Sequence, residues 1–302
     1  MRIPALVAAL LLSSCAAGPP ATLQSTTEPD SSNLAGWFDC LRNRGEAVVG
    51  AHRAGPAPGL PENALSTMAA TLLRNGNALL EIDVQASADG VLFLLHDDML
   101  DRTTTGTGRA SALPWAELKK LNLRDNGGAV TGVRIPTLSE ALALADAQGG
   151  IVQLDIKRGV DFAAVVAAVR AVEAEDSVII ITYRDEDALA MARLAPELMV
   201  SASIGSIAQA EALIAGGVRR DRLLAWTGTR APNPALYAEL RAAGIEQLFG
   251  TLGRPGQRLD DRWLADGDAS EFAALERDGA VVIATDRARE VEEALGPPSC
   301  RR

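Results

Sequence analysis

The amino-acid sequence predicts an α/β protein, folded as one (β/α)8 barrel with a small insertion after the second strand. From residue 47 to the end, short apolar runs alternate with amphipathic stretches, the pattern of βα units around a parallel sheet. The chain beyond residue 33 is about 265 residues long, which suits one large barrel or two smaller domains. No second low-complexity linker divides it, so we expect a single domain.

Nine apolar runs are strand candidates, one more than a (β/α)8 barrel needs: 47–52, 78–84, 91–96, 151–156, 177–182, 198–203, 223–228, 245–250 and 280–285. The second and third runs are joined only by "QASADG", in which Asp89-Gly90 is a hairpin turn signal. Parallel neighbours need a crossover of a dozen or more residues. The run 91–96 is therefore predicted to fold back antiparallel, which leaves eight barrel strands.

Amphipathic segments between these runs predict helices within 61–76, 137–150, 161–176, 185–195, 206–217, 233–244 and 287–295. Residues 97–135 contain no barrel strand and are rich in Gly and Thr. An insertion of this length at the second βα loop is expected to lie over the active-site face.

The amino terminus predicts export. Residues 1–14 have an early Arg and an apolar core too short to span a bilayer, as in a signal peptide. The "LSSC" that ends at Cys15 resembles the lipobox of bacterial lipoproteins, in which Cys15 becomes the lipid-carrying amino terminus. The alternative is an ordinary signal peptide cut later, with Cys15 discarded. We expect residues 15–33 to be a flexible tether, residues 34–302 to be the catalytic domain, and the protein to be lipid-anchored in the cell envelope, facing the periplasm from the outer membrane.

Charge and cysteine content limit the partners and the compartment. The formal net charge is −10 and no Lys/Arg run occurs, so nucleic acid is not an expected partner. Because an exported protein meets an oxidising compartment, Cys40 and Cys300 are predicted to form a disulfide. Two unpaired thiols are the alternative.

Carboxylates end two neighbouring barrel strands. Glu81 and Asp83 are two residues apart, so they share one face of their strand, and the next strand brings Asp155 and Lys157 to the same rim. Clustered carboxylates raise one another's pKa unless a positive charge lies between them, and a hard divalent cation with oxygen ligands meets this need. The alternative is that Glu81 or Asp83 caps the following turn or pairs with Arg53 and that no metal is bound.

The chain has two histidines, His52 and His96, and each ends a strand or hairpin arm at this rim. Although a lone His in a strand is usually a packing residue, two imidazoles beside clustered carboxylates favour a general acid and base pair. The neighbour of His52 is Arg53, a cation suited to phosphate, and that of His96 is Asp97, which could orient the imidazole.

Taken together, these segments resemble the glycerophosphodiester phosphodiesterase family. The resemblance runs from Ala47 to Leu295 and rests on "AHRAG", "PENALSTMAATLLRNG", "LLEIDVQASADGVLFLLHDDMLDRTTTGTG", "IPTLSEAL", "VQLDIK" and "GAVVIATD", in this order. It implies a barrel of the TIM type that hydrolyses glycerophosphodiesters to sn-glycerol 3-phosphate and an alcohol with one divalent cation, Ca²⁺ or Mg²⁺.

By position, the resemblance implies roles for residues in four groups: His52 and His96 as the acid-base pair, Arg53 and Lys157 as phosphate contacts, Glu81, Asp83 and Asp155 as metal ligands, and Glu62 and Asn63 as support for the site. Two departures stand out. Asp155 replaces the family's usual Glu, and "QLFGTLG" stands at the seventh strand in place of "WTVN", with Trp226 one strand earlier.

Two alternative functions are open on the sequence. One is a phospholipase that acts on intact lipids, against which the low aromatic content, 4%, and the lack of an amphipathic docking helix argue. The other is a lipid-anchored envelope protein without catalysis, and the Asp155 replacement is the one feature in its favour.

Overall fold

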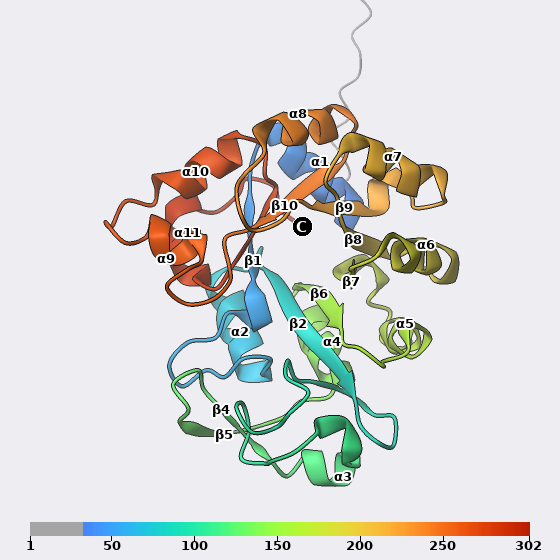
Figure 1. Ribbon diagram of the computed structural model, residues 1–302, viewed down its shortest axis with the longest axis vertical. Coiled ribbons are helices and arrows are strands. Elements are labelled where there is room, and N and C mark those ends of the chain that lie inside the picture. Colours follow the sequence, from blue (N-terminus) through green and yellow to red (C-terminus); the bar gives the residue numbers. More distant parts are fainter. Residues whose placement is uncertain (1–32) are drawn as a thin grey trace, which may run out of the picture.

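The computed structural model describes residues 33–302, so Cys15, the predicted signal peptide and residues 15–32 of the predicted tether lie outside the described residues. Eight parallel strands close into a barrel in which β1 pairs with both β2 and β11 (Figure 1). The barrel strands are β1 (Val48–Ala51), β2 (Leu79–Ala86), β6 (Ile151–Ile156), β7 (Val178–Thr182), β8 (Met199–Ser203), β9 (Leu223–Trp226), β10 (Glu246–Gly250) and β11 (Val282–Thr285). The predicted TIM-type barrel is therefore confirmed.

The ninth predicted run is a hairpin arm. Strand β3 (Leu92–Leu94) pairs antiparallel with the end of β2, with Leu94 opposite Val84. This pairing leaves β2 in the barrel and sends the chain back toward the carboxyl ends of the strands. His96 follows directly.

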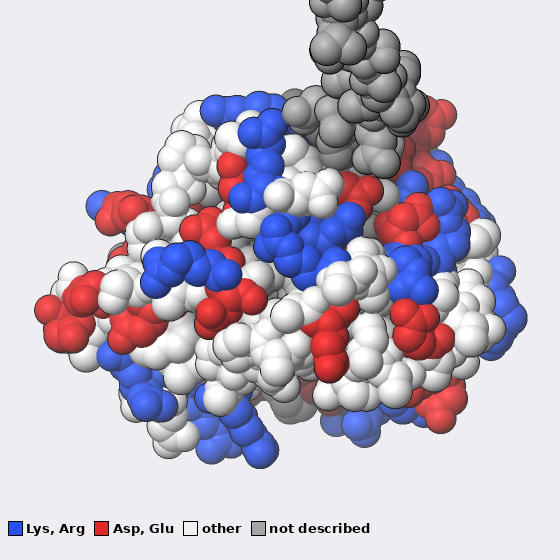
Figure 2. All heavy atoms as spheres, turned by 90° about the horizontal axis from the view of Figure 1, so that it is seen from above, with Lys and Arg blue, Asp and Glu red and all other residues white. Residues whose placement is uncertain are grey.

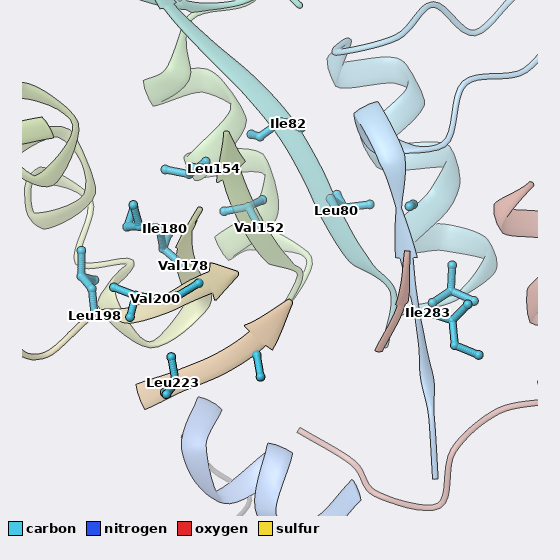
Figure 3. Packing of buried hydrophobic residues seen from close by; sticks show 14 of the residues in the cluster. Leu80, Ile82, Val152, Leu154, Val178, Ile180, Leu198, Val200, Leu223 and Ile283 are labelled. Atoms are coloured by element: carbon cyan, nitrogen blue, oxygen red, sulfur yellow. The ribbon is translucent and has the colours of Figure 1, made fainter. Parts of the chain in front are cut away.

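Alternate residues of each strand face opposite sides, and this alternation separates the core from the site. Leu80 and Ile82 of β2 belong with Val152 and Leu154 of β6 to the main apolar cluster, which packs between the sheet and the helices (Figure 3). The residues between them on β2, Glu81 and Asp83, face the barrel interior.

Helices cover the outside of the barrel: α2 (Leu65–Arg74), α4 (Leu138–Ala147), α5 (Phe162–Ala171), α6 (Asp185–Leu194), α7 (Ile207–Ala215), α8 (Pro234–Ala242), α9 (Leu259–Trp263), α10 (Ser270–Arg277) and α11 (Ala288–Leu295). The segments α9 and α10 lie where no helix was predicted. The insertion forms a lobe with α3 (Trp115–Leu118) and a two-stranded sheet of β4 (Asn122–Arg124) and β5 (Val130–Arg134) (Figure 1). Its small apolar core is shared with Phe93 and Leu95 of the hairpin arm.

A further helix that the sequence analysis did not predict, α1 (Leu34–Arg44), packs against the amino-terminal end of the barrel. Trp37 and Phe38 are fully buried in one cluster with Val48, Leu224 and other residues from the starts of the strands. Cys40 of α1 is joined by a disulfide to Cys300, 260 residues later, with 6.0 Å between their Cα atoms. The bridge holds α1 to the carboxyl-terminal segment of the chain.

The surface offers no extended basic region on the face shown in Figure 2, where Lys and Arg side chains are interspersed with Asp and Glu. Among residues 33–302, no helix is both long enough and apolar enough to cross a membrane.

Candidate active site

The site begins where β1 ends. His52, Arg53 and Ala54 form a single helical turn in which Arg53 and Ala54 have positive φ angles of 52° and 69°. Such angles are strained for residues other than glycine and occur mainly at functional sites. The backbone N–H of Arg53 donates to Glu81 Oε2 at 2.7 Å, so the turn is fixed against the neighbouring strand.

Three carboxylates converge beside this turn. Glu81, Asp83 and Asp155 each offer an oxygen, and these oxygens lie within 4.8 Å of one another. Register explains the convergence, since Asp83 on β2 lies opposite Asp155 on β6. Buried Asn63 completes the arrangement: its amide donates to Asp83 Oδ2 at 2.6 Å and its oxygen accepts from the Asp83 N–H at 2.9 Å.

The donor set fits a hard divalent cation, which takes carboxylate oxygens. Asp155 Oδ1 is buried and has no hydrogen-bond partner among residues 33–302, an arrangement that proteins rarely leave uncompensated. An oxygen of this kind, within reach of Glu81 and Asp83, is suited to coordinate a cation. These three residues would hold it.

Lys157, the second predicted phosphate contact, has its ammonium within the carboxylate cluster. Its ammonium contacts Asp83 Oδ1 at 2.5 Å and Asp155 Oδ2 at 2.6 Å, so it pairs with the carboxylate cluster. A phosphate contact would require Lys157 to leave these partners or to reach the phosphate from between them.

Burial and charge give the carboxylates different pKa values. Burial, and next the negative charge of Asp83, raise the pKa of Glu81 to about 8. Burial acts in the same direction on Asp83, but the Lys157 ammonium and the nearby His96 outweigh it and hold the pKa of Asp83 below its usual value. Glu81 is therefore protonated more readily than Asp83.

Both imidazoles are bound to carboxylates through Nδ1. His52 Nδ1 lies 2.6 Å from Asp286 Oδ1, and His96 Nδ1 lies 2.6 Å from Asp97 Oδ1. The second nitrogen of His52, Nε2, is directed toward the cluster, 4.0 Å from Glu81 Oε2. An ionised carboxylate only accepts hydrogen bonds, so each bonded Nδ1 carries its proton and each Nε2 is free to exchange one.

A chain of ion pairs connects His96 to Arg53, a predicted phosphate contact. Arg102, from the insertion, contacts Asp97 at 2.5 Å and Glu62 at 2.8 Å, and Glu62 in turn accepts from Arg53 at 3.0 Å. The hydrogen bonds from Arg102 lower the pKa of Asp97 to about 2, which keeps this carboxylate ionised. Glu62 is only 3% exposed, so it anchors both guanidinium groups from behind.

Two cavities meet at His52. The inner cavity, about 180 Å³, lies in the barrel mouth and is lined by Glu81 and Asp155 and by Tyr183, Trp226 and Leu252. The outer cavity, about 610 Å³, is lined by the guanidinium-bearing residues Arg53, Arg102 and Arg258 and by residues 125–128 of the insertion. The site thus joins an inner cavity that contains carboxylates to an outer cavity that contains three guanidinium groups.

The sequence analysis missed several residues of this site. Asp286 contacts His52, and Arg258 contacts Asp286 at 2.8 Å. A signal for Asp286 was present, because it ends a barrel strand in "VVIATD" as His52 does in "VVGAH". For Arg102 and Arg258, which lie in irregular segments, the local sequence gives no comparable signal.

The fold and the site together define a class: TIM-barrel proteins whose carboxyl rim joins an acidic, cation-compatible cluster to two imidazoles. Residues 52–211 match the model of the glycerophosphoryl diester phosphodiesterase family. The chain belongs to this family.

Individual relatives agree. The chain is 30% identical over 161 residues to a glycerophosphodiester phosphodiesterase of Caldanaerobacter subterraneus, an alignment that covers 51% of this chain and 65% of that protein. It is 40% identical over 119 residues to bovine glycerophosphodiester phosphodiesterase 1, covering 38% of this chain and 35% of the relative. The alignments thus span less than two thirds of these relatives' lengths.

Solved structures extend the likeness over the whole barrel. A glycerophosphoryl diester phosphodiesterase from Parabacteroides distasonis superposes with a TM-score of 0.74 at 26% identity, covering 89% of this chain and 94% of that one. A phosphodiesterase from Oleispira antarctica, in complex with the product sn-glycerol-3-phosphate, gives a TM-score of 0.65 at 24% identity and covers 84% of this chain and 98% of that one. The second likeness bears on the fold alone.

Proposed function

We propose that this protein hydrolyses glycerophosphodiesters to sn-glycerol 3-phosphate and an alcohol. Family membership supports the reaction class. The observation that carries the proposal for this chain is the convergence at one barrel rim of two Nδ1-anchored imidazoles and three carboxylates, with Arg53 beside them.

His52 and His96 are the proposed proton carriers. One Nε2 accepts the proton of the attacking oxygen, which belongs to water or to the neighbouring glycerol hydroxyl. The other donates a proton to the alcohol oxygen as its bond to phosphorus breaks. The guanidinium of Arg53, anchored on buried Glu62, orients the phosphate and stabilises the negative charge that develops on it.

A divalent cation, Ca²⁺ or Mg²⁺, is proposed to bind to Glu81, Asp83 and Asp155 and to supply positive charge next to the phosphoryl oxygens. The unpartnered Oδ1 of Asp155 supports this assignment. Lys157 would then neutralise the remaining charge of Asp83 and Asp155 from the other side of the cluster.

The test is release of sn-glycerol 3-phosphate from glycerophosphocholine and glycerophosphoethanolamine by the purified full-length chain, in Ca²⁺, in Mg²⁺ and in EDTA. We expect release that depends on the cation and that falls sharply in Asp155→Asn. The matched control is Glu197→Gln, which removes a carboxylate paired with Arg170 at the opposite end of the barrel. Equal release in EDTA would contradict the metal proposal, and no release from either diester would contradict the proposed reaction.

We further propose that Cys15 carries a lipid that holds the protein in the cell envelope, facing the periplasm. The "LSSC" sequence supports this proposal. Detergent-phase partitioning of the protein expressed in bacteria tests it: the natural chain should enter the detergent phase and Cys15→Ser should remain in the aqueous phase. If both partition alike, the anchor is contradicted.

A further inference from the structure

Two carboxylates that the proposed reaction does not use meet at the end of β11: Asp286, which follows this strand, and Asp260 of α9. Asp286 receives three hydrogen bonds on its two oxygens. Oδ1 contacts His52 Nδ1 at 2.6 Å, whereas Oδ2 accepts from Arg258 Nη1 at 2.8 Å and from the Gly253 N–H at 3.0 Å. With both oxygens engaged, this carboxylate has one orientation, and that orientation points Oδ1 at the imidazole.

The second carboxylate, Asp260, fixes the backbone at this point. It is fully buried, and its oxygens accept from the Thr285 hydroxyl at 2.8 Å and from the Asp286 N–H at 2.8 Å. Burying a carboxylate costs free energy unless donors surround it. The two hydrogen bonds of Asp260 therefore both stabilise its buried carboxylate and fix the backbone at Asp286. Asp260 thus holds Asp286, which in turn contacts His52.

We propose that Asp286 is the positioning residue of His52, with Asp260, Arg258 and Gly253 as its support. Asp286 keeps the proton of His52 on Nδ1 and so leaves Nε2, directed at the carboxylate cluster, to exchange a proton with the substrate. The inference rests on the proposed function, because it assumes that His52 carries a proton in the reaction. Asp286 does for His52 what adjacent Asp97 does for His96.

The opposing explanation is structural. Arg258 could pair with Asp286 only to close the loop after β10, with the imidazole contact a by-product. Asp261 separates the two explanations, because it also pairs with Arg258, at 3.0 Å, and accepts from the Gly256 N–H, but no contact joins it to His52 among the described residues. Asp261→Asn therefore weakens the same loop and leaves the imidazole contact in place.

The substitution Asp286→Asn makes a specific prediction. The two donors at Oδ2 require the amide oxygen on their side, which places the amide NH₂ opposite His52 Nδ1. Because NH₂ only donates, Nδ1 must become an acceptor and the proton moves to Nε2. The same exchange of carboxylate for amide in serine proteases inverts the imidazole tautomer and lowers kcat by about 10⁴.

The experiment is histidine ¹⁵N–¹H NMR on the full-length chain, with activity measured on glycerophosphocholine. Since the chain has two histidines, the spectrum is assigned with His52→Asn alone. We expect two Nδ1-protonated rings in the natural chain and in Asp261→Asn, and a His52 proton on Nε2 in Asp286→Asn. The kcat of Asp286→Asn should fall at least about a hundredfold with KM within about threefold.

Persistence of the Nδ1 proton of His52 in Asp286→Asn, or equal losses of kcat in Asp286→Asn and Asp261→Asn, would overturn the proposal. If Asp286→Asn does not fold, Arg258→Lys is the second variant to measure. Because lysine keeps a donor near Asp286 Oδ2, the proton of His52 should stay on Nδ1, and kcat should fall by much less than the hundredfold expected for Asp286→Asn. If the natural chain hydrolyses no diester, the proposed function fails, while the NMR result still decides whether Asp286 sets the tautomer.

Discussion

Lowering the pH below about 8 should weaken divalent cation binding through Glu81. Burial and the charge of Asp83 raise its pKa from 4.5 to about 8, so between these two values the cation-free folded protein holds a proton that the unfolded chain does not. A cation needs the ionised carboxylate and must displace that proton. At pH 7 most of the Glu81 side chains are therefore protonated, which lowers the apparent affinity for the cation, and at pH 6 the affinity is lower still.

Calorimetric titration of Ca²⁺ and Mg²⁺ at several pH values, in two buffers with different ionisation enthalpies, measures both effects. We expect protons to be released on cation binding at pH 6 and 7, and fewer as the pH rises past 8. Glu81→Gln should weaken the pH dependence, of which protonation of the neighbouring His52 accounts for the rest, and Glu197→Gln should leave it unchanged. An affinity that is constant from pH 6 to 8, without proton release, would refute the reasoning.

The remaining predictions concern catalysis, the disulfide and the inner cavity. His52→Ala and His96→Ala should each lose at least about a hundredfold in kcat, and near-normal turnover in either variant would contradict its role. Cys300→Ser opens a bridge between residues 260 apart, so the free energy of unfolding should fall by up to about 5 kcal/mol, and an unchanged denaturant midpoint would contradict the stabilising role of the bridge. In Gly250→Ala, the new Cβ would lie 2.6 Å from Trp226 Cη2 and 2.9 Å from Thr229 Cγ2, so Thr229 and the indole that lines the inner cavity must both move, and KM should rise severalfold. An unchanged KM in Gly250→Ala would contradict the steric reasoning.

The barrel could be predicted from the sequence because runs of apolar residues directly indicate buried strands. All nine predicted runs contain strands, and the short "QASADG" link forced the hairpin that the structure contains. Helix α1 was missed because charged residues interrupt "LAGWFDCLRNR", whose apolar side is buried only by contact with the barrel end. Its burial depends on tertiary contacts that local patterns do not encode.

The same distinction applies to the site. Period-two alternation along β2 placed Glu81 and Asp83 on one face, and parallel register brought Asp155 beside them. The contact of His52 with Asp286 joins residues 234 apart and exists because barrel closure makes β1 and β11 neighbours. The contacts of the Lys157 ammonium also depend on the tertiary fold, because its partners Asp83 and Asp155 lie on different strands.

The most direct test of the central claim is the identity of the products when the full-length chain acts on glycerophosphocholine, followed by phosphorus NMR. The proposed chemistry breaks the bond between phosphorus and the choline oxygen, so we predict sn-glycerol 3-phosphate as the phosphorus-containing end product, and its loss in His52→Ala. Accumulation of phosphocholine, or an unchanged diester in the presence of Ca²⁺ and of Mg²⁺, would contradict the account.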